Sequence, residues 1–193
     1  MRRAEQREQT RQALVRESRQ LFATLGYGAV GLSQIVAAAG VTKGALYHHF
    51  DSKADVFRAV LEQVQQEVAE QVVAAAEAHD DSWARLSAGC RAFLTASTAP
   101  EVQQIMLIDG PAVLGWAEWR ALDEAASAHH LAKALADLVA DGAIPPQPVE
   151  PLAHLLSGAM NEAALWLATT TSSTALEQTW AALARLLDGL RAR

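Results

Sequence analysis

Apolar residues recur every three or four positions along most of the chain, which is the spacing of an amphipathic helix. No stretch alternates apolar and polar residues as a half-buried strand does. With glycine and proline residues at the breaks, the pattern predicts an all-α fold of about nine helices. The expected helices cover residues 14–25, 33–39, 43–50, 53–79, 82–99, 101–108, 114–139, 149–168 and 174–191.

Two short helices joined by a glycine turn are expected between Gly31 and Phe50. Ser33 is placed to cap the first helix, Gly40 to end it, and Thr42 to cap the second. Such a pair forms a helix-turn-helix, whose second helix enters the major groove of DNA. A plain helix hairpin inside a bundle is the alternative for these residues taken alone.

The outward residues of this segment suit contacts with DNA. Lys43 can bind a guanine edge or a phosphate, and the small Gly44 and Ala45 let the backbone approach the groove. Residues 1–53 carry a net charge of +4 and the remainder −10, so the phosphate-facing surface is expected at the N-terminal end. The predicted DNA-binding residues are Ser33, Thr42, Lys43, Gly44, Ala45, Tyr47, His48 and Lys53.

Residues 1–11 are polar and rich in arginine. They are expected to form a partly disordered arm. Such an arm can reach neighbouring phosphates or the minor groove. A simple solubilising tail is the alternative.

The first quarter of the chain resembles the DNA-binding segment of the tetracycline-repressor (TetR) family of bacterial regulators. The resemblance rests on Leu21-Phe22, Gly26-Tyr27, Ala39-Gly40-Val41 and Leu46-Tyr47-His48-His49-Phe50. It implies a three-helix DNA-binding domain at residues 1–52, with the motif at 31–50. A helical effector-binding and dimerisation domain would follow at 53–193, with 53–79 as the connecting helix. The resemblance implies a homodimeric repressor in the bacterial cytoplasm, which a small hydrophobic ligand releases from a palindromic double-stranded operator.

The last two expected helices carry more apolar surface than a terminal hairpin needs. Leucine and tryptophan residues from Leu176 to Leu190 step at four and three positions, as in a coiled coil. In the TetR family these two helices pair with those of a second subunit. The predicted interface is Leu155, Gly158, Ala159, Ala163, Leu176, Trp180, Leu183 and Leu187, although the same residues could also form a core within one chain.

A hydrophobic pocket with a few polar contacts is expected in the second domain. Its predicted lining is Phe93, Met106, Asp109, Trp116, Trp119, His154, Asn161 and Trp166. Each tryptophan could instead be an ordinary core residue. A ligand bound there is expected to shift the helix at 53–79 and so change the separation of the two DNA-binding heads.

Other chemistry finds less support. Residues 26–31 match G-x-G-x-x-G, but a helix rather than a strand precedes them, which argues against a dinucleotide site. The adjacent histidine pairs 48–49 and 129–130 point about 100° apart on a helix, so no metal and no cofactor are predicted. The single Cys90 is expected in the core of a cytoplasmic protein, and no apolar run of about 18 residues predicts a membrane span.

No nucleophile elbow or phosphate loop is present, so the chain is not predicted to be an enzyme. Three alternatives stay open. One is a regulator of the same fold that has no small-molecule ligand or acts as an activator. The others are an effector-binding module without operator specificity and a helical enzyme.

Overall fold

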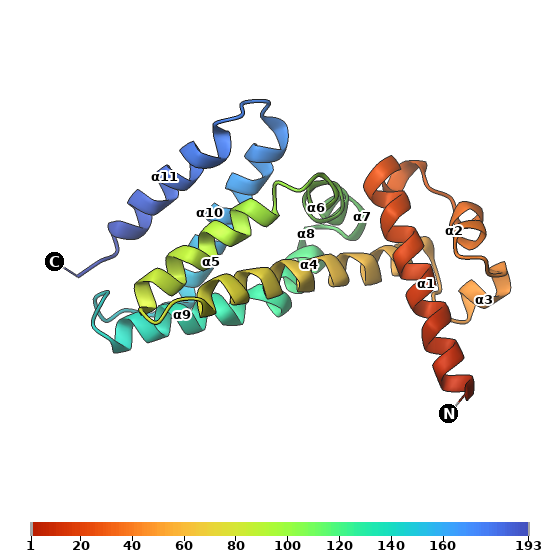
Figure 1. Cartoon of the computed structure of the whole chain (residues 1–193), viewed down its shortest axis with the longest axis horizontal. Coiled ribbons are helices and arrows are strands. Elements are labelled where there is room, and N and C mark those ends of the chain that lie inside the picture. Colours follow the sequence, from red (N-terminus) through yellow and green to blue (C-terminus); the bar gives the residue numbers. More distant parts are fainter. Residues whose placement is uncertain (1, 193) are drawn as a thin grey trace.

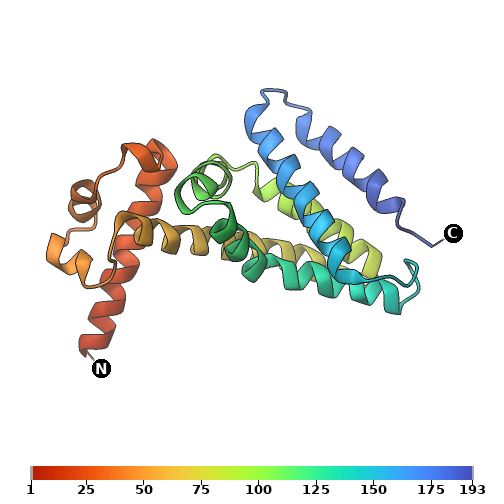
Figure 2. The same ribbon diagram turned by 180° about the vertical axis from the view of Figure 1, so that it is seen from behind.

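The computed structural model describes residues 2–192, except for the side chains of residues 2, 3, 127 and 128. Every regular element in that range is helical, which confirms the predicted all-α class. A small head with the first three α-helices lies at one end and a longer body at the other, and one long helix runs from the head into the body (Figure 1 and Figure 2). Among the described residues, no helix is both long enough and apolar enough to cross a bilayer.

The head consists of α1 (Arg2–Leu25), the short 3-10 turn η1 (Tyr27–Ala29), α2 (Leu32–Ala38) and α3 (Lys43–Tyr47). Helix α1 already includes residues 2–11, so the prediction of a partly disordered arm was wrong for these residues. Glutamine, glutamate, arginine and alanine are good helix formers. Side-chain bonds between successive turns add support, such as the one from Gln12 Nε2 to Glu8 Oε1 at 3.1 Å.

The first turns of the long helix α4 (Lys53–Glu77) belong to the core of the head. Ser52 caps this helix by accepting the Asp55 N–H at 3.1 Å. Phe57 is fully buried, and its ring centroid lies 5.3 Å from that of Phe22 and 5.2 Å from that of Tyr27. Because these rings interlock, α4 cannot change its direction without moving the head.

In the body, one group of helices packs against the remaining length of α4, and the later helices pack chiefly on that group (Figure 1). Helix α5 lies alongside α4, and α10 and α11 lie side by side at the far edge. The segments α6, η2 and α7 form one continuous helical stretch, as do α8, η3 and α9. The bounds are α5 (Ser82–Ala96), α6 (Pro100–Val102), the π-helix η2 (Gln103–Asp109), α7 (Gly110–Leu114), α8 (Trp116–Asp123), the π-helix η3 (Glu124–Ala128), α9 (His129–Ala140), α10 (Val149–Thr169) and α11 (Ala175–Asp188).

The expected interruption between the helices at 101–108 and 114–139 was wrong, because the helical stretch continues through Asp109, Gly110 and Pro111 to Leu114 and ends at Gly115, whose φ is +79°. Pro111 is the second residue of α7, directly after the π-helical stretch η2. Gly110 serves close packing. A Cβ there would lie 2.7 Å from Cδ1 of Trp119, a buried side chain whose Nε1 donates to the Met106 carbonyl at 2.7 Å.

Candidate nucleic-acid interface and effector cavity

The turn between α2 and α3 has the expected geometry at Gly40 and Thr42. Gly40 has a φ of +63°, and Thr42 Oγ1 accepts the Ala45 N–H at 3.1 Å. The start of α2 differs from the prediction. Gly31 is its N-cap residue, and the Gln34 side chain accepts the Gly31 N–H at 2.7 Å. Ser33 therefore does not cap the helix, and it lies exposed within the first turn.

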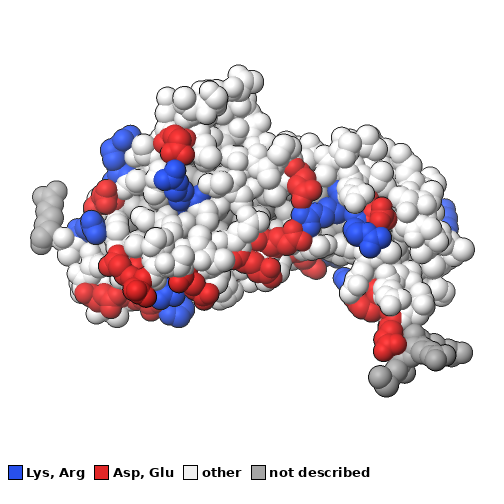
Figure 3. Space-filling model, in the orientation of Figure 1, with Lys and Arg blue, Asp and Glu red and all other residues white. Residues whose placement is uncertain are grey.

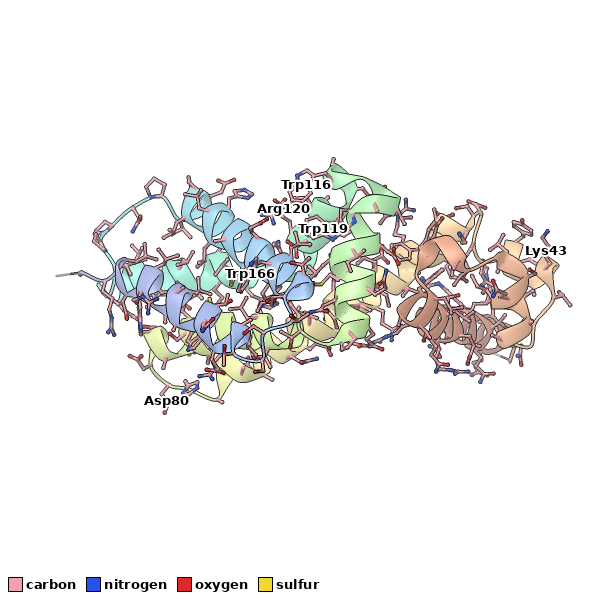
Figure 4. The ribbon with its side chains drawn as sticks, turned by 90° about the horizontal axis from the view of Figure 1, so that it is seen from above. Lys43, Asp80, Trp116, Trp119, Arg120 and Trp166 are labelled. Carbon is pink, nitrogen blue, oxygen red and sulfur yellow. The ribbon has the colours of Figure 1, made fainter. Side chains whose placement is uncertain are left out.

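Helix α3 buries one side and exposes the other. Leu46 is fully buried against the head core, whereas Lys43 and Tyr47 are exposed, Tyr47 to 47%. The Lys43 ammonium lies 5.9 Å from the centre of the Tyr47 ring. Figure 4 shows Lys43 at the tip of the head. The outward row of Thr42, Lys43, Gly44, Tyr47 and His48 is exposed and Ala45 is half-buried, an arrangement that suits a recognition helix.

Lys53, which was predicted to contact DNA, also makes hydrogen bonds within the chain. Its ammonium donates to the carbonyls of Tyr27 (2.9 Å) and Val30 (2.8 Å) and lies 3.9 Å from the centre of the Tyr27 ring. An ammonium has three hydrogens, so one is left for another acceptor. Lys53 therefore ties the start of α4 to η1, and its contact with a phosphate stays a prediction.

Polar contacts join the head to the body. Asp109 Oδ2, at the end of η2, accepts the Tyr27 N–H at 2.8 Å. Arg19 of α1 donates to Glu67 of α4 at 2.6 Å and also to Glu101 of α6. The hydrogen bond from Arg19 lowers the pKa of Glu67. Asp109 thus holds the head in place instead of lining a pocket.

A cavity of about 540 Å³ lies among α4, α5, α9 and α10, and α4 lines it with its C-terminal end, away from the head. Its wall is mainly apolar, as is usual for sites that bind small molecules. Burial raises the pKa of the Cys90 thiol in this wall to about 12, so the thiol stays protonated. The principal apolar lining residues are Val72, Leu86, Cys90, Phe93, Leu131 and Met160.

The buried end of the cavity is polar. Asn161 Nδ2 and Arg120 Nη1 each donate to Asp123 Oδ2 at 3.0 Å, and Arg120 also reaches Ser157 Oγ at 3.0 Å. Asp123 and Asn161 are 5% and 4% exposed. Burial raises the pKa of Asp123, and the bond from Asn161 and the charge of Arg120 oppose that rise.

The exposed end of the cavity is acidic. Figure 3 shows acidic side chains gathered along the lower edge of the body, and Figure 4 places Asp80 at the opposite end of the molecule from Lys43. The charged residues that line this end are Glu77, Asp80, Arg85, Lys133, Asp137 and Asp141.

Only two of the eight predicted pocket residues, Phe93 and Asn161, line this cavity. Met106 and Trp119 are core residues, and the Trp119 indole N–H donates to the backbone carbonyl of Met106. Trp116 and Trp166 are 63% and 49% exposed, and His154 is also exposed. The lining residues that the prediction missed come chiefly from α4, α5 and α9, and no local sequence signal shows that these three helices surround one cavity.

The predicted dimer residues divide into three groups. Leu155, Gly158 and Ala159 are exposed on α10, Leu155 to 73%. Leu183 and Leu187 are buried in the core of their own chain. The half-buried residues are Ala163, Leu176 and Trp180. On α10 and α11, the large apolar side chains that are exposed but were not predicted in the interface are Trp166 and Leu186, which is 67% exposed.

Comparisons with known proteins agree with this arrangement. A family model described as bacterial regulatory proteins, tetR family, matches residues 14–60, and a tetracyclin repressor-like C-terminal domain matches residues 83–190. The crystal structure of a TetR-family transcriptional regulator from Pectobacterium atrosepticum is similar at a TM-score of 0.85 and 32% identity, over 98% of this chain and 97% of that one.

Two further relatives are more distant or more local. The transcriptional repressor BepR of Brucella suis biovar 1 is 38% identical over 53 residues, which are 28% of this chain and 25% of BepR. This chain therefore spans about a quarter of the length of that curated relative. The crystal structure of RolR in complex with resorcinol shares the fold at a TM-score of 0.75 and 18% identity, over 95% of this chain and 89% of that one. With both domain models matched, the chain belongs to the tetracycline-repressor family of DNA-binding bacterial transcriptional regulators.

Proposed function

We propose that this regulator is a homodimeric repressor that leaves a palindromic operator when a small effector enters the cavity of the body. One observation carries the proposal: α4 takes part in both sites. Lys53 and Phe57 bind this helix to the head, and Val72 and Ala76 of the same helix line the cavity. At 1.5 Å per residue, about 28 Å of rigid helix separates Lys53 from Val72.

On the DNA side, Thr42, Lys43 and Gly44 would meet base edges, while Ser33, Tyr47 and His48 would hold phosphates. All six of these residues are exposed, which supports these roles. The two half-sites of an operator lie about 34 Å apart, so two heads must act together. The exposed apolar side chains of Leu155, Ala159 and Trp166, at helical spacing on α10, and Leu186 of α11 would form the subunit contact.

Release follows from the shared helix. An effector that separates α4 from α5 or α9 would tilt the N-terminal end of α4. The head would move with it because the Phe57 ring packs against Phe22 and Tyr27. An effector that favours the spread form 100-fold shifts the equilibrium by about 2.7 kcal/mol per site. RolR, which shares this fold, was solved with resorcinol, and this supports an effector of comparably small size.

A cavity-filling substitution tests the proposal. Ala134 lines the cavity on α9, whereas Ala136 is exposed on the same helix and does not line it, so Ala134→Phe and Ala136→Phe form a matched pair. A panel of small hydrophobic molecules is titrated into the complex of the protein with fluorescent operator DNA. Compounds that release the wild type and Ala136→Phe should fail with Ala134→Phe. Equal release from both variants would contradict a role for this cavity, and a reporter gene behind the operator tests the sign of regulation.

A further inference from the structure

The buried end of the cavity contains a hydrogen-bond acceptor that the chain does not use. Asn161 lines the cavity, and its Oδ1 is buried without a hydrogen-bond partner among the described residues. Its Nδ2 donates to Asp123 Oδ2 at 3.0 Å. This bond sets the orientation of the amide, because a flipped amide would point its oxygen at the carboxylate. Since buried polar groups in native proteins nearly always have a partner, this acceptor points to a donor supplied from outside the chain.

The charges around this acceptor are predominantly negative. Arg120 is shared between two carboxylates, with Nη1 3.0 Å from Asp123 Oδ2 and Nε 3.2 Å from Glu124 Oε1. At the exposed end, the Lys133 ammonium lies 2.8 Å from the Asp137 carboxylate. Glu77, Asp80 and Asp141 also line the cavity, and Arg85 is the remaining basic residue in its lining. Low-dielectric walls focus such a field, so a cation is attracted into the cavity and an anion is repelled.

We propose that the effector is a hydrophobic organic cation with N–H donors, such as a protonated primary amine. Its apolar part would lie between Leu86, Phe93 and Leu131, and its ammonium group would donate to Asn161 Oδ1 and the Asp123 carboxylate. A role of this cation in releasing DNA rests on the repressor function proposed above, whereas its binding to the cavity does not.

The same geometry ranks other classes of compound. A carboxylate would meet acceptors and negative charge at the buried end. A neutral alcohol would donate a hydrogen bond to Asn161 Oδ1 but gain little from the negative electrostatic potential of the cavity. A quaternary ammonium would gain from the field but could donate no hydrogen bond. Charge-assisted hydrogen bonds are stronger than neutral ones, so the primary ammonium combines both gains.

Four probes with the same apolar body test the proposal on the full-length protein without DNA. They are 4-phenylbutylammonium, its N,N,N-trimethyl derivative, 4-phenylbutanol and 4-phenylbutyrate, each titrated by calorimetry. The primary ammonium is expected to bind about tenfold more tightly than the alcohol and the trimethyl derivative, with the carboxylate weakest. Equal or tighter binding of the alcohol or the carboxylate would overturn the proposal.

Two variants test which residues cause the preference for the primary ammonium. Asn161→Leu should remove most of the advantage of the primary ammonium over its trimethyl derivative. Asp80→Asn/Asp141→Asn should weaken the ammonium about threefold to tenfold at low salt and leave the alcohol unchanged. The control is Glu5→Gln/Asp188→Asn, which removes two exposed acids outside the cavity. Equal losses for alcohol and ammonium would contradict the charge assignment, and this double variant decides the matter even if Asn161→Leu fails to fold.

The same four probes, titrated into the operator complex, separate this inference from the repressor function. An ammonium that binds with the expected preference but leaves DNA bound would uphold the ligand class and refute the effector role. Release by the alcohol or the carboxylate without preference for the ammonium would uphold effector-driven release and refute the ligand class.

Discussion

Substitution of Asp109 should loosen the head from the body without disturbing either core. Asp109 Oδ2 accepts the Tyr27 N–H at 2.8 Å in a half-buried position. Asp109→Ala removes the acceptor and leaves that N–H without its partner. Asp109→Asn is the matched control, because the amide oxygen can still accept the hydrogen bond although the charge is lost.

The size of the effect follows from the surroundings of the bond. A hydrogen bond to a charged group contributes about 1.5–3 kcal/mol when it is well buried. Water can partly replace the lost carboxylate here, so the unfolding free energy should fall by about 1–2 kcal/mol in Asp109→Ala. Asp109→Asn should lose less than about 1 kcal/mol. The contacts of Arg19 with Glu67 and Glu101 remain, so the head should stay folded on α4.

Two measurements check this prediction. Urea unfolding at one fixed protein concentration gives the change in free energy, because a dimer has a concentration-dependent midpoint. Hydrogen exchange of the Tyr27 amide reports the bond itself, and about 1.4 kcal/mol corresponds to tenfold faster exchange. Wild-type exchange and a wild-type midpoint in Asp109→Ala would refute the assignment of this residue to the joint.

Three further substitutions or treatments test other parts of the structure. Gly110→Ala should lower the unfolding free energy by about 1–3 kcal/mol, because its methyl group would lie 2.7 Å from buried Trp119, whereas Gly28→Ala meets nothing within 4 Å and should melt near the wild-type temperature. Arg19 lowers the pKa of Glu67, so the ionised Glu67 carboxylate stabilises the fold above the ordinary glutamate pKa of about 4.3. This contribution is lost as the pH falls through the lowered pKa. The unfolding free energies of wild type and Glu67→Gln should therefore differ at pH 7 and converge in acid. Cys90, with a pKa of about 12, should react with iodoacetamide at pH 8 far more slowly in the native protein than in urea, as mass spectrometry can measure.

The helix-turn-helix could be predicted because its signals are local. Gly40 takes the positive φ that ends α2, and the Thr42 hydroxyl caps α3 three residues before its bonding partner. Neither feature depends on distant parts of the chain. Two predictions for the head were wrong because neighbouring residues compete for the same roles. The Gln34 side chain, inside α2, bonds to the Gly31 N–H in place of a Ser33 cap, and good helix formers extend α1 to Arg2.

The body was harder to predict because its determinants are distant in sequence. Trp119 became core instead of pocket because the Met106 carbonyl and the gap at Gly110 accept its indole. The leucines of α11 lie on two sides of the helix: Leu183 and Leu187 of the predicted seam are buried in their own chain, whereas Leu186, which is not part of that seam, is exposed. Spacing alone identifies an apolar helix face, but not which neighbour covers it.

The DNA-binding surface of α3 is tested most directly by selecting the sequences that the full-length protein binds from a random DNA pool. Two recognition helices related by a two-fold axis should enrich a palindrome whose half-sites are centred one helical turn apart, or a multiple of one turn, about 10 base pairs each. Lys43→Ala should then bind the enriched site more weakly by about 1–3 kcal/mol if the lysine reads a base. Enrichment of sites without two-fold symmetry, together with unchanged binding by Lys43→Ala, would contradict the assignment of α3 as the recognition helix.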